Sequence, residues 1–151
     1  MNKKKKILLI GVVVLVVIAA IALFLAIYNK DSNKLKRYLK HNGYTCNEKV
    51  CNFNDDGIVY TIDYHNGLYT VTGITYLQID PVKNNATYYG SNVTEETQQC
   101  FFSNTDASVF TKFTESDTSS NCTNFLSFVN REVGKYQTII VKSKVDISKL
   151  K

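Results

Sequence analysis

The sequence predicts an α+β protein with a fixed order of elements: an N-terminal transmembrane helix, a short helix, an antiparallel β-meander and a C-terminal helix. Three observations predict this order. Residues 7–28 are apolar and carry no charge, residues 58–72 alternate apolar and polar side chains around an Asn-Gly pair, and apolar residues recur at helical spacing from residue 121 onward.

The apolar segment 7–28 is long enough to cross a membrane. As a helix it measures roughly 33 Å, against about 30 Å for a hydrocarbon core. The alternative is a cleaved signal peptide, because the lysines of residues 3–6 resemble its basic region and Ala20-Ile21-Ala22 resembles a cleavage site. The apolar run continues past that site, so we favour a retained signal anchor. This gives a cytoplasmic basic tail at 1–6, a transmembrane span at 7–28 and an extracytoplasmic domain at 29–151.

The charges on the two sides of this span do not decide its orientation. Four lysines precede it, and five basic residues follow it within a short distance. We place the N-terminus in the cytoplasm and the domain outside the cell membrane because the cysteines suit an oxidising compartment. The membrane-proximal basic residues could contact anionic headgroups, but a solvated helix face is the interpretation favoured by the sequence alone. These residues are Lys34, Lys36, Arg37 and Lys40.

The formal net charge of +5 hides an uneven distribution. Residues 46–120 contain far more acidic than basic side chains, so the middle of the domain is negatively charged. A nucleic-acid-binding protein needs the opposite sign on a contiguous face. We therefore expect no nucleic acid partner.

Residues 32–40 predict a short helix whose buried face carries Leu35, Tyr38 and Leu39. Ser32 is the expected N-cap of this helix, and Gly43 is expected to end it.

The region after this helix predicts a β-hairpin. Asn66-Gly67 suits a two-residue type I′ turn, which sets Tyr64 opposite Tyr69 and Ile62 opposite Val71. One register then separates apolar from polar side chains on both strands. The apolar face would also carry Ile58 and Tyr60, and the polar face Thr61, Asp63, Thr70 and Thr72.

Further elements follow with weaker patterns. We expect strands at 74–79, 100–102 and 109–113, a loop or weak strand at 82–97 and a loop at 114–120. From residue 121 the 4,3,4,3,4 spacing of apolar residues predicts one long helix. Gly134 and the β-branched residues 138–141 favour an alternative, a helix ending near Gly134 and a last strand, but we give more weight to the periodicity.

The four cysteines are expected to form two disulfides, Cys46–Cys51 and Cys100–Cys122, if neighbours in the sequence pair. A zinc site would need closer paired ligands, and a redox dithiol would need a C-x-x-C motif. Residues 52–57, together with Asp63, partly match a calcium-binding loop. However, the first position is Asn52 rather than Asp, and the last position is Asp63 where a bidentate Glu is needed. A plain turn is the better interpretation, and we expect no metal or other cofactor.

Catalytic motifs are missing from the sequence, and neither His41 nor His65 has a spaced nucleophile beside it. We therefore expect no enzyme and no catalytic residue. A hydrolase would require a pocket that gathers Asp55, Asp56, Asp63 and a histidine.

The opening residues KKKKILLIG, the short helix and the segment GYTCNEKVCN give the chain a recognisable layout. In this layout it resembles small, Lys- and Asn-rich, single-pass exported proteins of low-G+C Gram-positive bacteria. The resemblance implies membrane anchoring and export, and it assigns no functional residue. We expect an extracytoplasmic binding or interaction module that uses the polar sheet face. The alternative is an accessory or structural subunit that assembles with other membrane proteins through residues 7–28.

Overall fold

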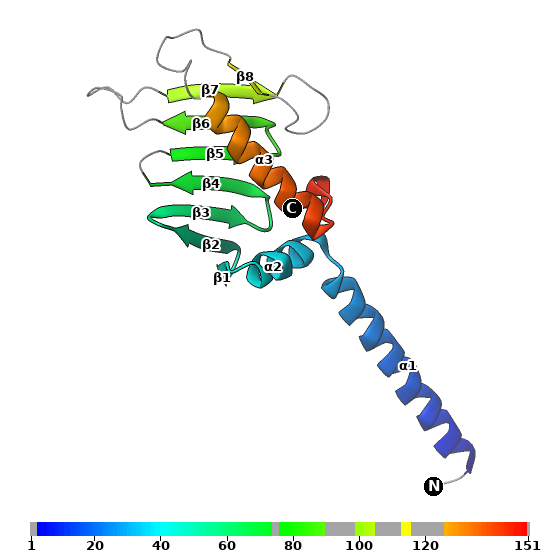
Figure 1. The fold of residues 1–151 in the computed structure, drawn as a ribbon. Coiled ribbons are helices and arrows are strands. Elements are labelled where there is room, and N and C mark those ends of the chain that lie inside the picture. The colour runs from blue at the N-terminus through cyan, green and yellow to red at the C-terminus, as the bar shows by residue number, and fades with distance from the viewer. Residues whose placement is uncertain (1–2, 74–75, 90–98, 105–112, 116–125, 151) are drawn as a thin grey trace.

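The computed structural model of the protein describes residues 3–73, 76–89, 99–104, 113–115 and 126–150. It confirms the α+β fold and the order of the elements (Figure 1). The helices are α1 (Lys3–Tyr28), α2 (Asp31–His41), α3 (Leu126–Ser143) and the short 3₁₀ helix η1 (Ile147–Lys149).

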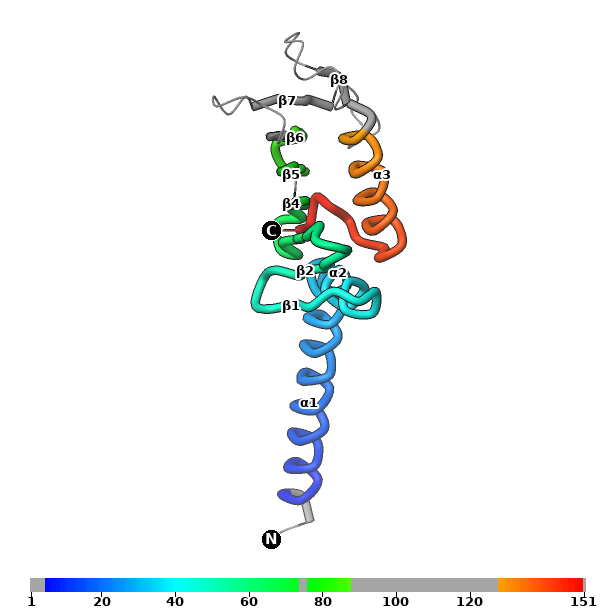
Figure 2. Tube along the Cα trace, turned by 60° about the vertical axis from the view of Figure 1, so that its left-hand side comes forward, coloured from blue at the N-terminus to red at the C-terminus, as the bar shows by residue number. Residues whose placement is uncertain are grey.

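The described strands form one antiparallel sheet in which every strand pairs with its neighbours in the sequence. The strands are β1 (Thr45–Asn47), β2 (Val50–Asp55), β3 (Ile58–Asp63), β4 (Leu68–Thr72), β5 (Tyr76–Asp80), β6 (Asn85–Tyr89), β7 (Gln99–Asn104) and β8 (Phe113–Glu115). Figure 2 shows α3 standing to one side of the strands. The predicted β-meander is therefore confirmed.

The core lies between the sheet and the helices. Alternate residues of β3, β4 and β5 are buried, as expected for strands with one covered face. From α3, Val129, Val133, Tyr136 and Ile140 are buried, with the 4,3,4 spacing of the predicted stripe. The helix runs through Gly134 and the β-branched residues, so the long-helix prediction is confirmed and the last strand is not formed. Residues 121–125, where the prediction began, lie outside the described residues.

Helix α2 packs Leu35 and Leu39 into the core, with Tyr38 partly buried beside them. The predicted cap is wrong: Lys30 occupies the N-cap position, and Ser32 is a buried residue of the first turn. The predicted end is confirmed. Gly43 has a φ of 88°, and the Tyr44 N–H donates to the Leu39 carbonyl at 3.0 Å, which closes the helix as glycine C-caps do.

The register of the β3–β4 hairpin differs from the prediction by two residues. Tyr69 pairs with Ile62, and Asp63 pairs with Leu68, so the loop spans residues 64–67. The side chain of Asp63 explains the longer loop. Its Oδ1 accepts the N–H of His65 at 2.8 Å and that of Asn66 at 3.3 Å. The backbone carbonyl of Asp63 accepts the Gly67 N–H at 2.7 Å. A two-residue shift keeps each side chain on its expected face, and the sorting of apolar from polar residues is confirmed.

The type I′ turn occurs one hairpin earlier, between β2 and β3. Asp55 pairs with Ile58, and the two residues between them, Asp56 and Gly57, have φ values of 47° and 86°. The Asn54 Oδ1 accepts the Gly57 N–H at 3.0 Å. The interpretation of residues 52–57 as a turn is thus confirmed.

Later strands agree with the prediction in part. β5 ends at Asp80, one residue beyond the predicted strand 74–79, a strand forms at β6, and β7 contains the predicted strand 100–102. Residues 114 and 115, expected in a loop, belong to β8 because they pair with β7. Residues 74–75, 90–98, 105–112 and 116–120 lie outside the described residues.

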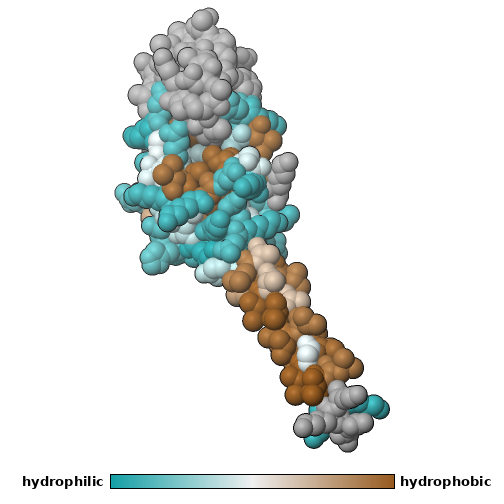
Figure 3. Space-filling view, turned by 90° about the vertical axis from the view of Figure 1, so that its right-hand side faces the viewer, coloured by the Kyte–Doolittle hydropathy of each residue, from teal (hydrophilic) through white to brown (hydrophobic). Residues whose placement is uncertain are grey.

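Helix α1 stands apart from the domain. Among the described residues it is the one helix whose length and composition allow it to cross a membrane, over Lys5–Tyr28. No part of its most apolar stretch is buried within the protein. Figure 3 shows it as a mainly brown column below a mainly teal domain, with some brown side chains on the domain itself.

Cys46 and Cys51 form a disulfide between directly paired residues of β1 and β2. This half of the disulfide prediction is confirmed. Cys122 lies outside the described residues, so the pair Cys100–Cys122 remains a prediction.

Replacing both Cys46 and Cys51 by serine is expected to lower the free energy of unfolding by about 2 kcal/mol, from the closure entropy of a loop this short. Denaturant unfolding of the full chain in detergent micelles measures this. Treating the unmutated protein with a reductant is the control, and it should lower stability by at least as much. A double serine variant as stable as the unmutated protein would show that the disulfide adds no stability.

Candidate binding cleft

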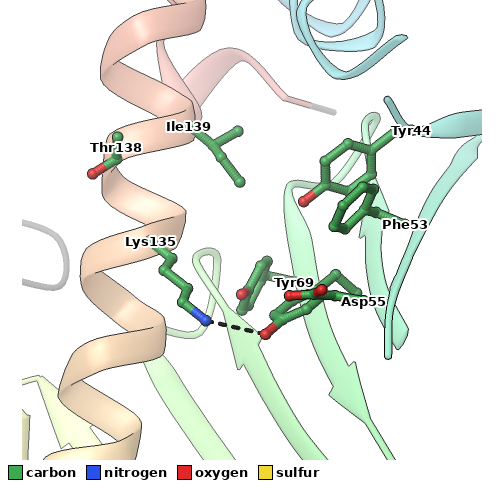
Figure 4. Close-up of a pocket in the computed structure, with 8 residues that line it drawn as sticks. Tyr44, Phe53, Asp55, Tyr69, Lys135, Thr138 and Ile139 are labelled. Carbon is green, nitrogen blue, oxygen red and sulfur yellow. Dashed lines mark hydrogen bonds between the residues drawn. The ribbon is translucent and has the colours of Figure 1, made fainter. Parts of the chain in front are cut away.

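An open cleft of about 340 Å³ lies between α3 and the first strands of the sheet. Figure 4 shows Tyr44 and Phe53 on one side and Lys135, Thr138 and Ile139, from α3, on the other. The remaining lining residues are Asp55, Tyr60 and Tyr69. Its size falls at the lower end of the usual range for small-molecule sites, and aromatic walls with a few polar groups are typical of them.

The aromatic walls form a continuous row of rings across the sheet. Phe53 and Tyr60 are paired residues of β2 and β3, with ring centroids 6.3 Å apart. Tyr44 lies 5.2 Å from Phe53, and Tyr69 lies 6.3 Å from Tyr60. Tilted rings at these separations attract one another and fix each other's orientation. The cleft is therefore preformed by packing.

A buried carboxylate organises the polar groups at the base of the cleft. Glu132 is fully buried, and its Oε2 accepts the Tyr69 hydroxyl at 2.9 Å. Its Oε1 accepts Lys135 Nζ at 2.9 Å and Arg131 Nε at 3.2 Å. Lys135 also donates to the Tyr60 hydroxyl at 3.0 Å, which is the dashed line in Figure 4. A buried charge is tolerated when it is paired and hydrogen-bonded in this way.

This environment raises the pKa of several groups. Burial raises the pKa of Tyr44 to about 12, with a smaller effect from Tyr60. Burial also raises the pKa of Tyr69, and the Glu132 carboxylate adds to this. For Lys135, burial lowers the pKa, but its hydrogen bonds to Tyr60 and Glu132 outweigh this and the pKa is raised overall.

We expect the domain to lose stability as the pH rises above about 10. The unfolded chain releases its tyrosine protons near the ordinary pKa of 10.0, whereas folded Tyr44 keeps its proton up to about 12. The folded state then binds more protons than the unfolded state, so the stabilisation is complete below pH 10 and is lost through this window. Denaturant unfolding at pH 8 to 12 measures the effect. Tyr69→Phe should make the decline shallower, and a stability independent of pH up to 12 would contradict this account.

The predicted membrane-proximal basic residues do not share one contact but have different surroundings. Lys34 pairs with Asp31 at 3.1 Å, and Lys36 donates to the Tyr64 hydroxyl at 3.2 Å. Arg37 donates to the Tyr28 carbonyl at 2.7 Å, and Lys40 is exposed.

The aspartates named for a possible hydrolase do not gather. Asp55 lines the cleft, whereas Asp63 lies at the other end of β3 and stabilises the β3–β4 loop. On the predicted polar sheet face, Thr61 donates to Asn52 Oδ1 at 2.8 Å. A second hollow of about 670 Å³ lies beside Asp63 and the β1–β2 turn, but no aromatic side chain lines it.

Sequence reasoning missed Glu132, Lys135 and the cleft itself. Glu132 looks like a member of a surface ion pair because Arg131 and Lys135 stand beside it. The available signal was its position three residues after Val129 and four before Tyr136, which places it on the buried stripe of the helix.

Comparisons with protein-family models, with curated proteins and with solved structures found no match.

Proposed function

We propose that the protein is a membrane-anchored extracytoplasmic binding module whose ligand occupies the aromatic cleft, with no catalytic activity. The observation that carries this proposal is the cleft itself: preformed aromatic walls joined to a hydrogen-bonded polar base. The anchor is α1, and the Cys46–Cys51 disulfide supports an oxidising location.

The charges at the cleft indicate which ligand fits. Lys135 and Arg131 share the Glu132 carboxylate. The Asp55 carboxylate lines the cleft and has no hydrogen bond or ion pair within the described part of the chain. A ligand with a flat apolar body would stack on the tyrosine and phenylalanine rings. A cationic end would be attracted both by the Asp55 carboxylate and by the ring faces. The ligand class is therefore an aryl or alkyl ammonium compound, or a peptide side chain of that chemistry.

The test uses the full chain in nanodiscs, with its tyrosines replaced by 3-fluorotyrosine and observed by ¹⁹F NMR. Phenethylammonium is titrated alongside neutral phenethyl alcohol and anionic phenylacetate. Saturable shifts of cleft tyrosines, strongest for the cation and weakened by Asp55→Asn, are the expected result.

A matched pair of variants on α3 locates the binding. Ile139→Trp fills the cleft and should abolish the shifts. Val141→Trp adds the same side chain at a position that is 74% exposed and does not line the cleft, so it should leave them unchanged. No saturable shift with any probe would overturn the cleft as a binding site.

A second candidate function rests on α1. Its apolar surface is unburied within the protein and is therefore available to other membrane helices. Ala22 and Ala26 place two small residues one turn apart, a spacing that allows close helix approach. Exchanging residues 7–28 for an unrelated apolar helix should preserve a binding module but abolish the activity of an accessory subunit.

A further inference from the structure

The end of α1 is bound by side chains of α2. Arg37 Nη1 donates to the Tyr28 carbonyl at 2.7 Å, and Asn33 Nδ2 donates to the Ile27 carbonyl at 2.8 Å. These carbonyls belong to the last turn of α1, where the regular intrahelical partners end, and the Ile27 carbonyl also accepts the Lys30 N–H at 3.2 Å. The Arg37 guanidinium also lies 3.7 Å from the centre of the Tyr28 ring. Several contacts thus fix α2 relative to the last residue of the apolar span.

These contacts identify which face of α2 is turned toward the end of α1. Asn33, Arg37 and Lys40 are spaced by four and three residues, so they share one face of the helix. That face is opposite Leu35 and Leu39, which are buried in the domain. Figures 1 and 2 show α2 lying across the end of α1.

The charge of this face is positive and largely uncompensated. Lys30 and Lys40 are exposed on either side of Arg37. The nearby acid, Asp31, is 9% exposed and already pairs with Lys34. At about 1.5 Å per residue, Lys30 and Lys40 are separated by roughly 15 Å along the helix, enough to reach different lipid headgroups.

We infer that this face of α2 is a docking surface for an anionic lipid bilayer, with Lys30, Arg37 and Lys40 facing the headgroups. The inference rests on the membrane anchoring proposed above and is independent of the cleft. It departs from the solvated face that the sequence alone favoured, because the bonds from Arg37 and Asn33 to α1 orient the basic residues toward the bilayer surface.

The chain contains no tryptophan, so a single introduced indole can report which lipids lie beside α2. His41→Trp places it on an exposed residue next to Lys40. The full chain is reconstituted in nanodiscs of one composition, phosphatidylcholine with about 20–30% of the anionic lipid phosphatidylglycerol. In one sample the phosphatidylglycerol is brominated, and in the other an equal fraction of phosphatidylcholine is brominated.

We expect quenching by brominated phosphatidylglycerol to exceed that by brominated phosphatidylcholine about threefold or more. High salt or Lys30→Gln with Lys40→Gln should remove the difference. Lys83→Gln, in the β5–β6 turn, changes an exposed lysine far along the sheet and should preserve it. Equal quenching by the two lipids would overturn the anionic preference and leave the anchoring intact. No quenching by either would overturn the placement of α2 at the bilayer altogether.

Discussion

Replacing Glu132 by alanine is expected to lower the free energy of unfolding by about 3 kcal/mol, a large fraction of the total for a small domain. The fully buried carboxylate accepts hydrogen bonds from Tyr69, Lys135 and Arg131. Its removal leaves the Tyr69 hydroxyl in the core without a partner, and a buried unpaired group is costly. Lys135 and Arg131 are 46% and 62% exposed, so they can turn to solvent and contribute less to the loss.

Denaturant unfolding of the full chain in micelles, followed by near-UV circular dichroism, measures the change. Glu132→Gln keeps an acceptor for Tyr69 and should cost less than the alanine variant. Lys142→Ala, at an exposed position of the same helix, should remain within about 0.5 kcal/mol of the unmutated protein. A Glu132→Ala protein of unchanged stability would mean that this network does not stabilise the domain.

Replacing Gly67 by alanine is expected to destabilise the domain by roughly 2–4 kcal/mol, from backbone strain and close contacts together. Gly67 has a φ of +67°, a conformation that residues with a Cβ seldom adopt. A Cβ there would lie 2.9 Å from the Tyr136 hydroxyl, 2.9 Å from Leu150 Cδ1 and 3.3 Å from Pro81 Cγ. Tyr136 cannot easily move away, because it is fully buried and its hydroxyl donates to the Gly67 carbonyl.

Gly57 provides a matched control. Its φ is +86°, but a Cβ there would meet nothing within 4 Å. Gly57→Ala should therefore show the strain alone, about 1 kcal/mol. Chemical denaturation of both variants separates the two causes, and equal losses would indicate that the close packing around Gly67 contributes nothing.

The β3–β4 hairpin shows what the sequence can and cannot predict. Alternation of apolar and polar residues determined the faces of both strands correctly, because a strand with one buried face tolerates no odd shift. The turn type was assigned to Asn66-Gly67, whereas the two-residue turn formed at Asp56-Gly57. Both dipeptides favour that turn, and the contacts of the Asp63 side chain stabilise the longer loop at residues 64–67.

The cleft could not be predicted from the sequence, for a different reason. Its lining residues come from before β1, from three strands and from α3, so they are brought together by the fold. Local patterns placed Tyr60 and Tyr69 on the apolar face of the sheet, but they did not identify Tyr44, Phe53 or the gap between these rings and α3. Helix α1 and the Cys46–Cys51 pair were predictable, since each depends on residues close in sequence.

Thiol labelling of intact cells tests most directly whether the proposed membrane-anchored domain lies outside the cell with its cysteines oxidised. In a Cys100→Ser and Cys122→Ser variant, a membrane-impermeant maleimide would report on Cys46 and Cys51 alone. We predict labelling only after an external reductant has been added. Labelling that requires cell lysis but no reductant would place free thiols in the cytosol and contradict both the orientation and the disulfide.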